Sequence, residues 1–293
     1  MEDRRASKSS ELVKTMGIVY GIAAALCWGA SDFVVTHVSR AIGVRHTFFY
    51  VQLVGMVLAG ALLLFRPGAP APTPLVWLLV VGIGLFNVIG TLLLYRSFAI
   101  GTLALVSPIA SGFAVVSALL ALLAGERPAR LALLGALLLV GGVVVVSRSP
   151  HDRQAATLAG VPEALGVTLC FGVSLWALDY VTPALGILWP VLVLRCVELV
   201  CAIGLLARQR ALPARLNAPR WVLVVLGALL DTLAFIAFNM GLGSAYTTIV
   251  TALASLFSAV TVLLAWVFLR ERLAPAQWAG VAVILCGVLL VSM

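Results

Sequence analysis

The chain has 293 residues, of which 63% are hydrophobic and only 10% are charged, and its formal net charge is +8. Soluble domains are about 45–50% apolar and about 25% charged, so this composition excludes a soluble protein and indicates an integral membrane protein. The positive charge lies almost wholly in the N-terminal tail and short loops, which indicates topology and lipid contact and excludes nucleic-acid binding.

Ten apolar segments of about spanning length follow one another, and the absence of β-barrel alternation predicts that they are helices. They cover 16–37, 47–65, 74–97, 103–124 and 130–147, then 161–181, 187–207, 220–241, 246–269 and 275–293. The basic start resembles a signal peptide, but the segment behind it reaches spanning length, so we expect a retained first helix. The predicted organisation is a basic tail (1–15), five helices (16–147), a loop (148–160) and five more helices (161–293).

The two halves repeat one another at an offset of 145 residues. At this offset the loop Gly125-Glu126-Arg127-Pro128 corresponds to Arg270-Glu271-Arg272-Leu273, and the glycines at 135 and 142 correspond to those at 280 and 287. Five spans is an odd number, so the second half enters the membrane in the opposite direction. The sequence therefore predicts an all-α membrane fold of ten helices, built as two inverted five-helix repeats with both termini on one side.

Two charge patterns give opposite answers about the side of the membrane on which the termini lie. Cytoplasmic termini would place 7 Lys and Arg residues on the cytoplasmic face and 11 on the other face, which the positive-inside rule disfavours. The charges around the first helix favour cytoplasmic termini instead, because four basic residues precede this helix and two follow it. We expect the termini to be cytoplasmic and the protein to lie in the inner membrane of the cell.

Three stretches carry a resemblance to a known family: Leu26-Cys27-Trp28-Gly29-Ala30-Ser31-Asp32-Phe33, Gly101 through Pro108 to Gly125-Glu126-Arg127, and Leu263-Leu264-Ala265-Trp266 to Glu271-Arg272. By these motifs and by its internal repeat, the chain resembles the EamA-type ten-helix members of the drug/metabolite transporter superfamily. The resemblance covers nearly the whole length after the N-terminal tail. The resemblance implies transport of a small solute, with export the commoner direction. Family members carry amino acids, nucleotide-sugar-like metabolites, quaternary ammonium compounds and drugs.

Polar residues within the spans also recur between the halves. Offsets of 143 to 148 pair two tryptophans, two aspartates, a glutamine with an arginine, and an asparagine with an aspartate. A charge at the centre of a spanning helix costs about 2.5–3.5 kcal/mol, so such groups face a cavity or a partner. We predict that they surround a central polar cavity, and the candidate substrate-binding or coupling residues are Trp28, Asp32, Gln52, Asn87, Trp176, Asp179, Arg195, Glu198, Asp231 and Asn239.

Each charged candidate has a structural alternative. Arg195 and Glu198, three residues apart, form either an ion pair that fixes helix packing or, if it opens, a site for a substrate carboxylate or phosphate. Asp32 and Asp179 lie toward the ends of their spans and either reach headgroups and water or hold a cation. Desolvation disfavours a charged carboxylate, so Asp231 at mid-span is the expected group for proton-coupled antiport, and Asp231→Asn should abolish coupling without affecting expression.

The aromatic candidates have alternatives of the same kind. Trp28 and Trp176 lie one turn before the paired aspartates, where each ring and carboxylate can enclose a cation, although a tryptophan near a helix end can also be an interfacial anchor. Tyr95 and Arg96, at the end of the third span, are interpreted as interface residues. His37 and His46 lack the spacing of metal ligands, so no metal or cofactor is expected.

The leading hypothesis is a secondary active transporter that exports a small organic metabolite, amino-acid-like solute or drug by alternating access, with protons as the candidate coupling ion. No Gly-x-x-x-x-Gly-Lys loop is present, so ATP does not drive transport directly. The alternative is an intramembrane enzyme that modifies a lipid or metabolite, with Asp32 and Asp179 as its carboxylate pair. The expected partners are the substrate, membrane lipid and protons, with the chain acting as a monomer or homodimer.

Overall fold

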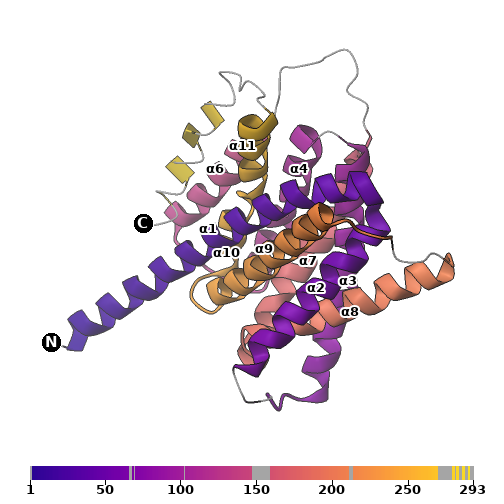
Figure 1. Ribbon diagram of the computed structural model, residues 1–293. Coiled ribbons are helices and arrows are strands. Elements are labelled where there is room, and N and C mark those ends of the chain that lie inside the picture. Colours follow the sequence, from indigo (N-terminus) through magenta and orange to yellow (C-terminus); the bar gives the residue numbers. More distant parts are fainter. Residues whose placement is uncertain are drawn as a thin grey trace.

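The computed structural model describes residues 2–65, 68, 70–101, 103–146, 159–210 and 214–269, with the helical positions 279–280, 282–283, 286–287 and 290. All regular structure in these ranges is α-helical (Figure 1). The second Glu-Arg loop, most of the predicted tenth span and the loop over 147–158 lie outside the described residues. The helices are α1 (Glu2–Ile42), α2 (Val44–Leu64), α3 (Pro74–Ile100), α4 (Leu103–Ser111), α5 (Phe113–Leu123), α6 (Arg130–Val146), α7 (Val161–Leu185), α8 (Leu188–Arg208), α9 (Ala218–Leu242), α10 (Thr247–Ala254) and α11 (Phe257–Leu269).

Seven stretches of the described residues are long and apolar enough to cross a membrane: Thr15–Ile42, Val44–Leu64, Pro74–Ile100, Val161–Leu185, Leu188–Arg208, Ala218–Leu242 and Thr247–Leu264. Ile109–Leu123 and Leu133–Gly142 are shorter apolar helices. Large apolar side chains on the outside of the bundle, such as Leu78 and Val200, are each 68% exposed, as expected of a surface that faces lipid. The structure thus shows a multi-pass helical membrane protein with seven such spans in the part that it describes, and the predicted count of ten is not confirmed.

The strongest helix packing joins the two halves of the chain. Helix α1 runs along α9, α3 packs along α7, and α2 packs along α8 (Figure 1). Exchanging the halves converts the α1–α9 pair into the α7–α3 pair and returns the α2–α8 pair to itself. This is the packing that the predicted inverted repeat requires, and it places α2 and α8 next to the pseudo-two-fold axis.

A glycine turn joins the first two helices of each half, α1 to α2 and α7 to α8. Gly43 alone separates α1 from α2 and has a φ of 85°, while Gly186, with a φ of 73°, precedes Ile187 between α7 and α8. Only glycine adopts this left-handed region without strain, so both hairpins depend on it. The two glycines are 143 residues apart, which is also the offset that pairs Gln52 with Arg195.

Gly287 of the second half packs against Gly135 of the first half. A Cβ atom added at Gly287 would lie 2.9 Å from the backbone oxygen of Gly135 and 2.9 Å from Cγ of Leu139, so the last segment approaches α6 at backbone distance. Close helix packing of this kind is what small residues provide in lipid. Gly287, one of the repeated glycines, therefore allows the last described segment to approach α6 closely at Gly135 and Leu139.

The fourth predicted span of each half is broken in two. In the first half α4 ends at Ser111 and α5 begins at Phe113, and in the second half α10 ends at Ala254 and α11 begins at Phe257. At the first break, the Thr168 hydroxyl on α7 donates a hydrogen bond to the backbone oxygen of Ile109. Interrupted helices are tolerated at membrane depth where the backbone is buried or lines a cavity, so the breaks point toward the centre of the bundle.

The repeated Glu-Arg loop of the first half caps a helix of the second half. The Glu126 carboxylate accepts hydrogen bonds from the backbone N–H of Thr247 at 2.8 Å, the backbone N–H of Thr248 at 3.1 Å and the Thr248 hydroxyl at 2.8 Å. A carboxylate at this position satisfies unpaired N–H groups of α10 and complements its dipole. The loop thereby ties the two halves together at one end of the bundle.

Candidate functional site

A cavity of about 40 Å³ lies at the centre of the bundle, between helices of both halves. This is room for a group the size of a few water molecules. The lining residues are Trp28, Ser31, Asp32, Asn87, Thr91, Leu94, Tyr95, Phe113, Phe171, Leu175, Asp231, Phe235 and Phe257. Four of the predicted candidates, Trp28, Asp32, Asn87 and Asp231, are therefore brought together in one wall.

Arg195 is the centre of a buried polar network behind that wall. Its side chain is 1% exposed, Nη2 lies 2.7 Å from Oδ2 of Asp231, and Nη1 donates to Oε1 of Gln52 at 2.5 Å. Nη1 is also 3.4 Å from Oε2 of Glu198, and the guanidinium carbon lies 5.2 Å from the ring centre of Phe235. Nη2 makes no hydrogen bond of good geometry with the described residues, so its contact with Asp231 is chiefly an attraction of opposite charges.

The network continues into α1 and α3. The Trp28 indole N–H donates to Oδ1 of Asp231 at 3.1 Å, which links the two halves of the chain. The Thr91 hydroxyl lies 3.2 Å from Oε1 of Glu198 and 3.1 Å from Oδ1 of Asn87, and it donates to one of them at a time. Five helices, α1, α2, α3, α8 and α9, thus contribute side chains to one connected polar structure.

Helical spacing explains why these side chains meet. Asn87, Thr91 and Tyr95 follow one another at intervals of four residues, so all three lie on one face of α3. The same interval places Trp28 above Asp32 on α1. Each helix therefore presents a short polar and aromatic stripe to the cavity while its other faces remain apolar.

Space for the guanidinium depends on a glycine. A Cβ atom added at Gly55 on α2 would lie 3.0 Å from Nε and 3.1 Å from Cδ of Arg195, and 3.3 Å from the Thr232 hydroxyl. These distances are tighter than normal packing, so a larger residue would push Arg195 out of place. The position of the central charge is set by α2 and α8 together.

Asp32 differs from the other two acidic groups of the site. It lines the cavity and is 7% exposed, yet among the described residues its carboxylate has no hydrogen-bond or ion-pair partner. Asp231 lies close enough to repel its charge. If Asp32, Glu198 and Asp231 were all ionised, one guanidinium would have to compensate three carboxylates. A buried charge without a partner costs roughly several kcal/mol. The site therefore favours a proton or a cation at Asp32.

Comparison with protein families identifies the architecture. A model of the EamA-like transporter family matches residues 15–148 and again residues 158–293. The chain belongs to the EamA-like transporter family. The match confirms the resemblance seen in the sequence and makes this a membrane protein of a transporter family, in which two copies of the family unit follow one another.

One solved structure, described only as the crystal structure of a protein, shares the fold of this EamA-like chain. The two are 20% identical, superimpose with a TM-score of 0.70, and the match covers 94% of this chain and 98% of the other. At this identity the likeness concerns the fold alone. No curated protein matches the chain.

Three predicted site residues of the EamA-like chain belong neither to the lining of the central cavity nor to the polar network behind it. Trp176 is half-buried and packs edge-on against Tyr180, one turn later on α7, with ring centres 5.1 Å apart. Asp179 and Asn239 line a separate hollow between α1, α7 and α9, where the Asn239 amide donates to the backbone oxygen of Ile187 at 3.0 Å. Of the two tryptophan–aspartate pairs that were each expected to enclose a cation, only Trp28 and Asp32 line the central cavity.

Tyr95 belongs to the site, although the sequence interpretation placed it at the membrane interface. It is 4% exposed and lines the cavity, whereas its neighbour Arg96 is exposed and pairs with Glu163 at 2.9 Å. The spacing from Asn87 would have revealed the position, since Tyr95 lies two turns further along the same face. Thr91, between them, was missed for the same reason.

Proposed function

We propose that this EamA-like protein is a secondary active transporter that exports a small organic solute by alternating access around the central cavity. The observation that carries the proposal is the connected polar network, which draws on five helices of both halves and borders a cavity near the middle of their spans. Polar groups at that depth are costly and are typical of substrate and ion pathways. Rocking of helices around this fixed site then exposes the cavity to either side.

Protons are the proposed coupling ion, and Asp32 is the group that exchanges them. The charged or titratable groups facing Asp32 are Asp231 on α9 and Tyr95 on α3, with Arg195 and Glu198 of α8 behind Asp231. Because Asp231 is already paired with Arg195 and Trp28, it is less free to exchange a proton than the sequence suggested. Asp32 has no such partner among the described residues, so it takes over the coupling role first assigned to Asp231.

An intramembrane enzyme is less well supported by the same geometry. A two-carboxylate mechanism needs both groups at one substrate, but Asp179 lies outside the cavity that Asp32 lines. Among the described lining residues there is no histidine or cysteine to act as base or nucleophile. A carrier requires only that the site bind its solute and change access.

Counterflow in proteoliposomes tests the proposal. Vesicles containing the purified protein and an internal pH-sensitive dye are offered labelled alanine, choline, putrescine or glucose 6-phosphate, each against an internal pool of the same solute. We expect saturable counterflow of at least one solute. In vesicles without the internal pool, entry of that same solute should be accompanied by proton movement in the opposite direction. Asp32→Asn should uncouple solute movement from proton movement. Chemical conversion of the solute, flux that does not saturate, or no counterflow for any solute would refute the proposal.

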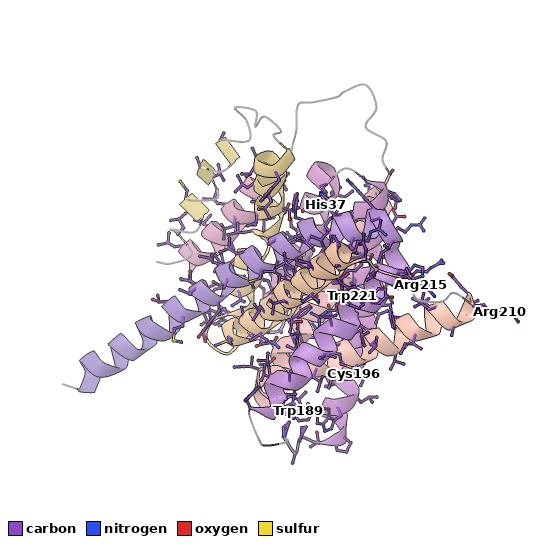
Figure 2. The ribbon with its side chains drawn as sticks, in the orientation of Figure 1. His37, Trp189, Cys196, Arg210, Arg215 and Trp221 are labelled. Atoms are coloured by element: carbon purple, nitrogen blue, oxygen red, sulfur yellow. The ribbon has the colours of Figure 1, made fainter. Side chains whose placement is uncertain are left out.

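We also propose cytoplasmic termini, on the basis of the charges that flank the first helix. Arginines gather at the opposite end of the bundle, where Figure 2 shows Arg210 and Arg215 at the far end of α8 from Trp189, and this pattern favours the reverse orientation. Labelling of intact cells with an impermeant maleimide decides between them, on a background without the native cysteines. Cytoplasmic termini predict labelling of Gln209→Cys and protection of Ala124→Cys, and the opposite result would reverse the orientation.

A further inference from the structure

We infer that the transported solute carries a cationic amine, which the Asp32 carboxylate binds inside a cage of aromatic rings. The inference rests on the proposed transport function and narrows it to one chemical class. It draws on three independent features of the cavity: the charge balance, the rings that line it, and an amide donor without an acceptor.

The charge balance selects a cation. Arg195, the only basic side chain of the described network, is held by Asp231 and Glu198 and does not line the cavity. Asp32 does line it, and Asp231, which also lines it, repels the Asp32 charge. An ammonium group in the cavity would compensate Asp32, whereas an anionic group would face a second negative charge without a cation to hold it.

The lining rings are suited to the same ligand. Within the described part of the chain, six aromatic side chains border the cavity: Trp28, Tyr95, Phe113, Phe171, Phe235 and Phe257. Trp28 is fixed in place because its N–H bonds Asp231 and its ring meets Phe235 edge-on at 5.2 Å, while Phe113 and Phe257, which begin the two broken-helix segments, stack at 6.0 Å. Ring faces attract a desolvated cation, and a carboxylate beside them adds a direct charge pair.

Asn87 indicates a second feature of the solute. Its side chain is 1% exposed, its Oδ1 faces the Thr91 hydroxyl, and its Nδ2 has no acceptor among the described residues. A buried amide donor left unpaired is unfavourable, so a ligand oxygen that accepts from Nδ2 would improve binding. Because Asp32 and Asp231 both line the cavity, a neutral hydroxyl or carbonyl fits this position better than a carboxylate.

Binding to the purified full-length protein tests the inference. The probes are choline and 2-phenylethylammonium, each with its neutral isostere, 3,3-dimethylbutan-1-ol or 2-phenylethanol, and 3-phenylpropanoate as the anion. Isothermal titration calorimetry should show that at least one cation binds more tightly than its isostere by about tenfold or more, and that the anion does not bind. Asp32→Asn should weaken cation binding by about the same factor. The control Glu163→Gln, which removes a carboxylate outside the cavity, should leave the affinity unchanged.

A second variant guards against a folding defect in Asp32→Asn. Phe171→Leu keeps the cavity apolar but removes one ring, so it should weaken the cation more than the neutral isostere. Equal binding of cations and isosteres, tighter binding of the anion, or full cation affinity in Asp32→Asn would overturn the inference. Counterflow of an anionic or neutral solute without any cation binding would support the proposed transport function and refute the inference of a cationic solute. Cation binding without counterflow of any solute would support the cation site and refute the transport function.

Discussion

Removing the guanidinium at the centre of the network is the most informative perturbation of stability. Arg195 is buried between Asp231, at 2.7 Å, and Glu198, at 3.4 Å, and Arg195→Gln leaves both carboxylates without a cation. Breaking a buried ion pair from one side costs about 3–5 kcal/mol. Asp231→Asn should cost less, about 1.5–3 kcal/mol, because Glu198 still compensates the arginine and the new amide oxygen still accepts from Trp28. This expectation replaces the sequence-based one that Asp231→Asn leaves expression intact.

A double-mutant cycle measures the pair itself. The free energy of unfolding is obtained by titrating the protein with SDS in mixed micelles, for the wild type, Arg195→Gln, Asp231→Asn and the double variant. The double variant should be more stable than the sum of the single effects predicts, by about 1–3 kcal/mol, since it contains no uncompensated Asp231 charge. Additive effects, with a coupling energy below about 0.5 kcal/mol, would show that the two groups do not interact in the folded protein.

Three further substitutions test neighbouring parts of the structure by the same unfolding measurement. Gly55→Ala should destabilise the protein because the added Cβ would lie 3.0 Å from the Arg195 side chain. The control Gly60→Ala, whose Cβ would meet no described atom within 4 Å, should be neutral or stabilising by up to about 1 kcal/mol. Equal effects of the two substitutions would contradict the packing at Gly55. Glu126→Ala should cost about 1–2 kcal/mol through loss of the α10 cap, with Glu126→Gln retaining part of it, and a cost near zero would refute the cap. Trp28→Phe keeps the ring but removes the donor to the Asp231 carboxylate, so it should cost about 1.5–3 kcal/mol; unchanged stability would mean that the bond contributes nothing.

The internal offset of the sequence predicted the centre of the site well, for a physical reason. Gln52 and Arg195 lie near the middle of α2 and α8, next to the pseudo-two-fold axis, and the structure shows them in direct contact. Asn87 and Asp231 are also central in their helices and line the same cavity. Residues near the middle of a span remain close to the axis when the halves are exchanged, so matched central positions converge.

Matched positions away from the middle diverge instead. Asp32 and Asp179 both lie toward the C-terminal ends of their helices, and an inverted repeat runs those helices in opposite directions. The exchange therefore carries Asp179 to the other end of the bundle, into the hollow that it shares with Asn239. The off-centre depth of the aspartates was visible in the sequence, but its consequence follows only once the direction of each helix is taken into account.

Only the first of the two helix breaks had a signal in the sequence. Pro108 and Gly112 disfavour a continuous helix over 103–124, whereas 246–269 contains neither proline nor glycine. Hydrophobic pattern alone does not distinguish one long helix from two short ones. In the structure each break is followed directly by a phenylalanine that lines the cavity, Phe113 in one half and Phe257 in the other. Tertiary contacts, such as the bond from Thr168 to Ile109, stabilise these interruptions, and a single-sequence pattern carries no record of them.

Access to the cavity from each side is the most direct test of the account. Leu175 lines the cavity on α7 and has no polar role, so Leu175→Cys on a background without the native cysteines reports access without disturbing the network. The protein is reconstituted in one orientation and treated with an impermeant thiol reagent from either side. Alternating access predicts labelling from both sides, with the balance shifted by a proton gradient. Labelling from one side only, whatever the gradient, would contradict it.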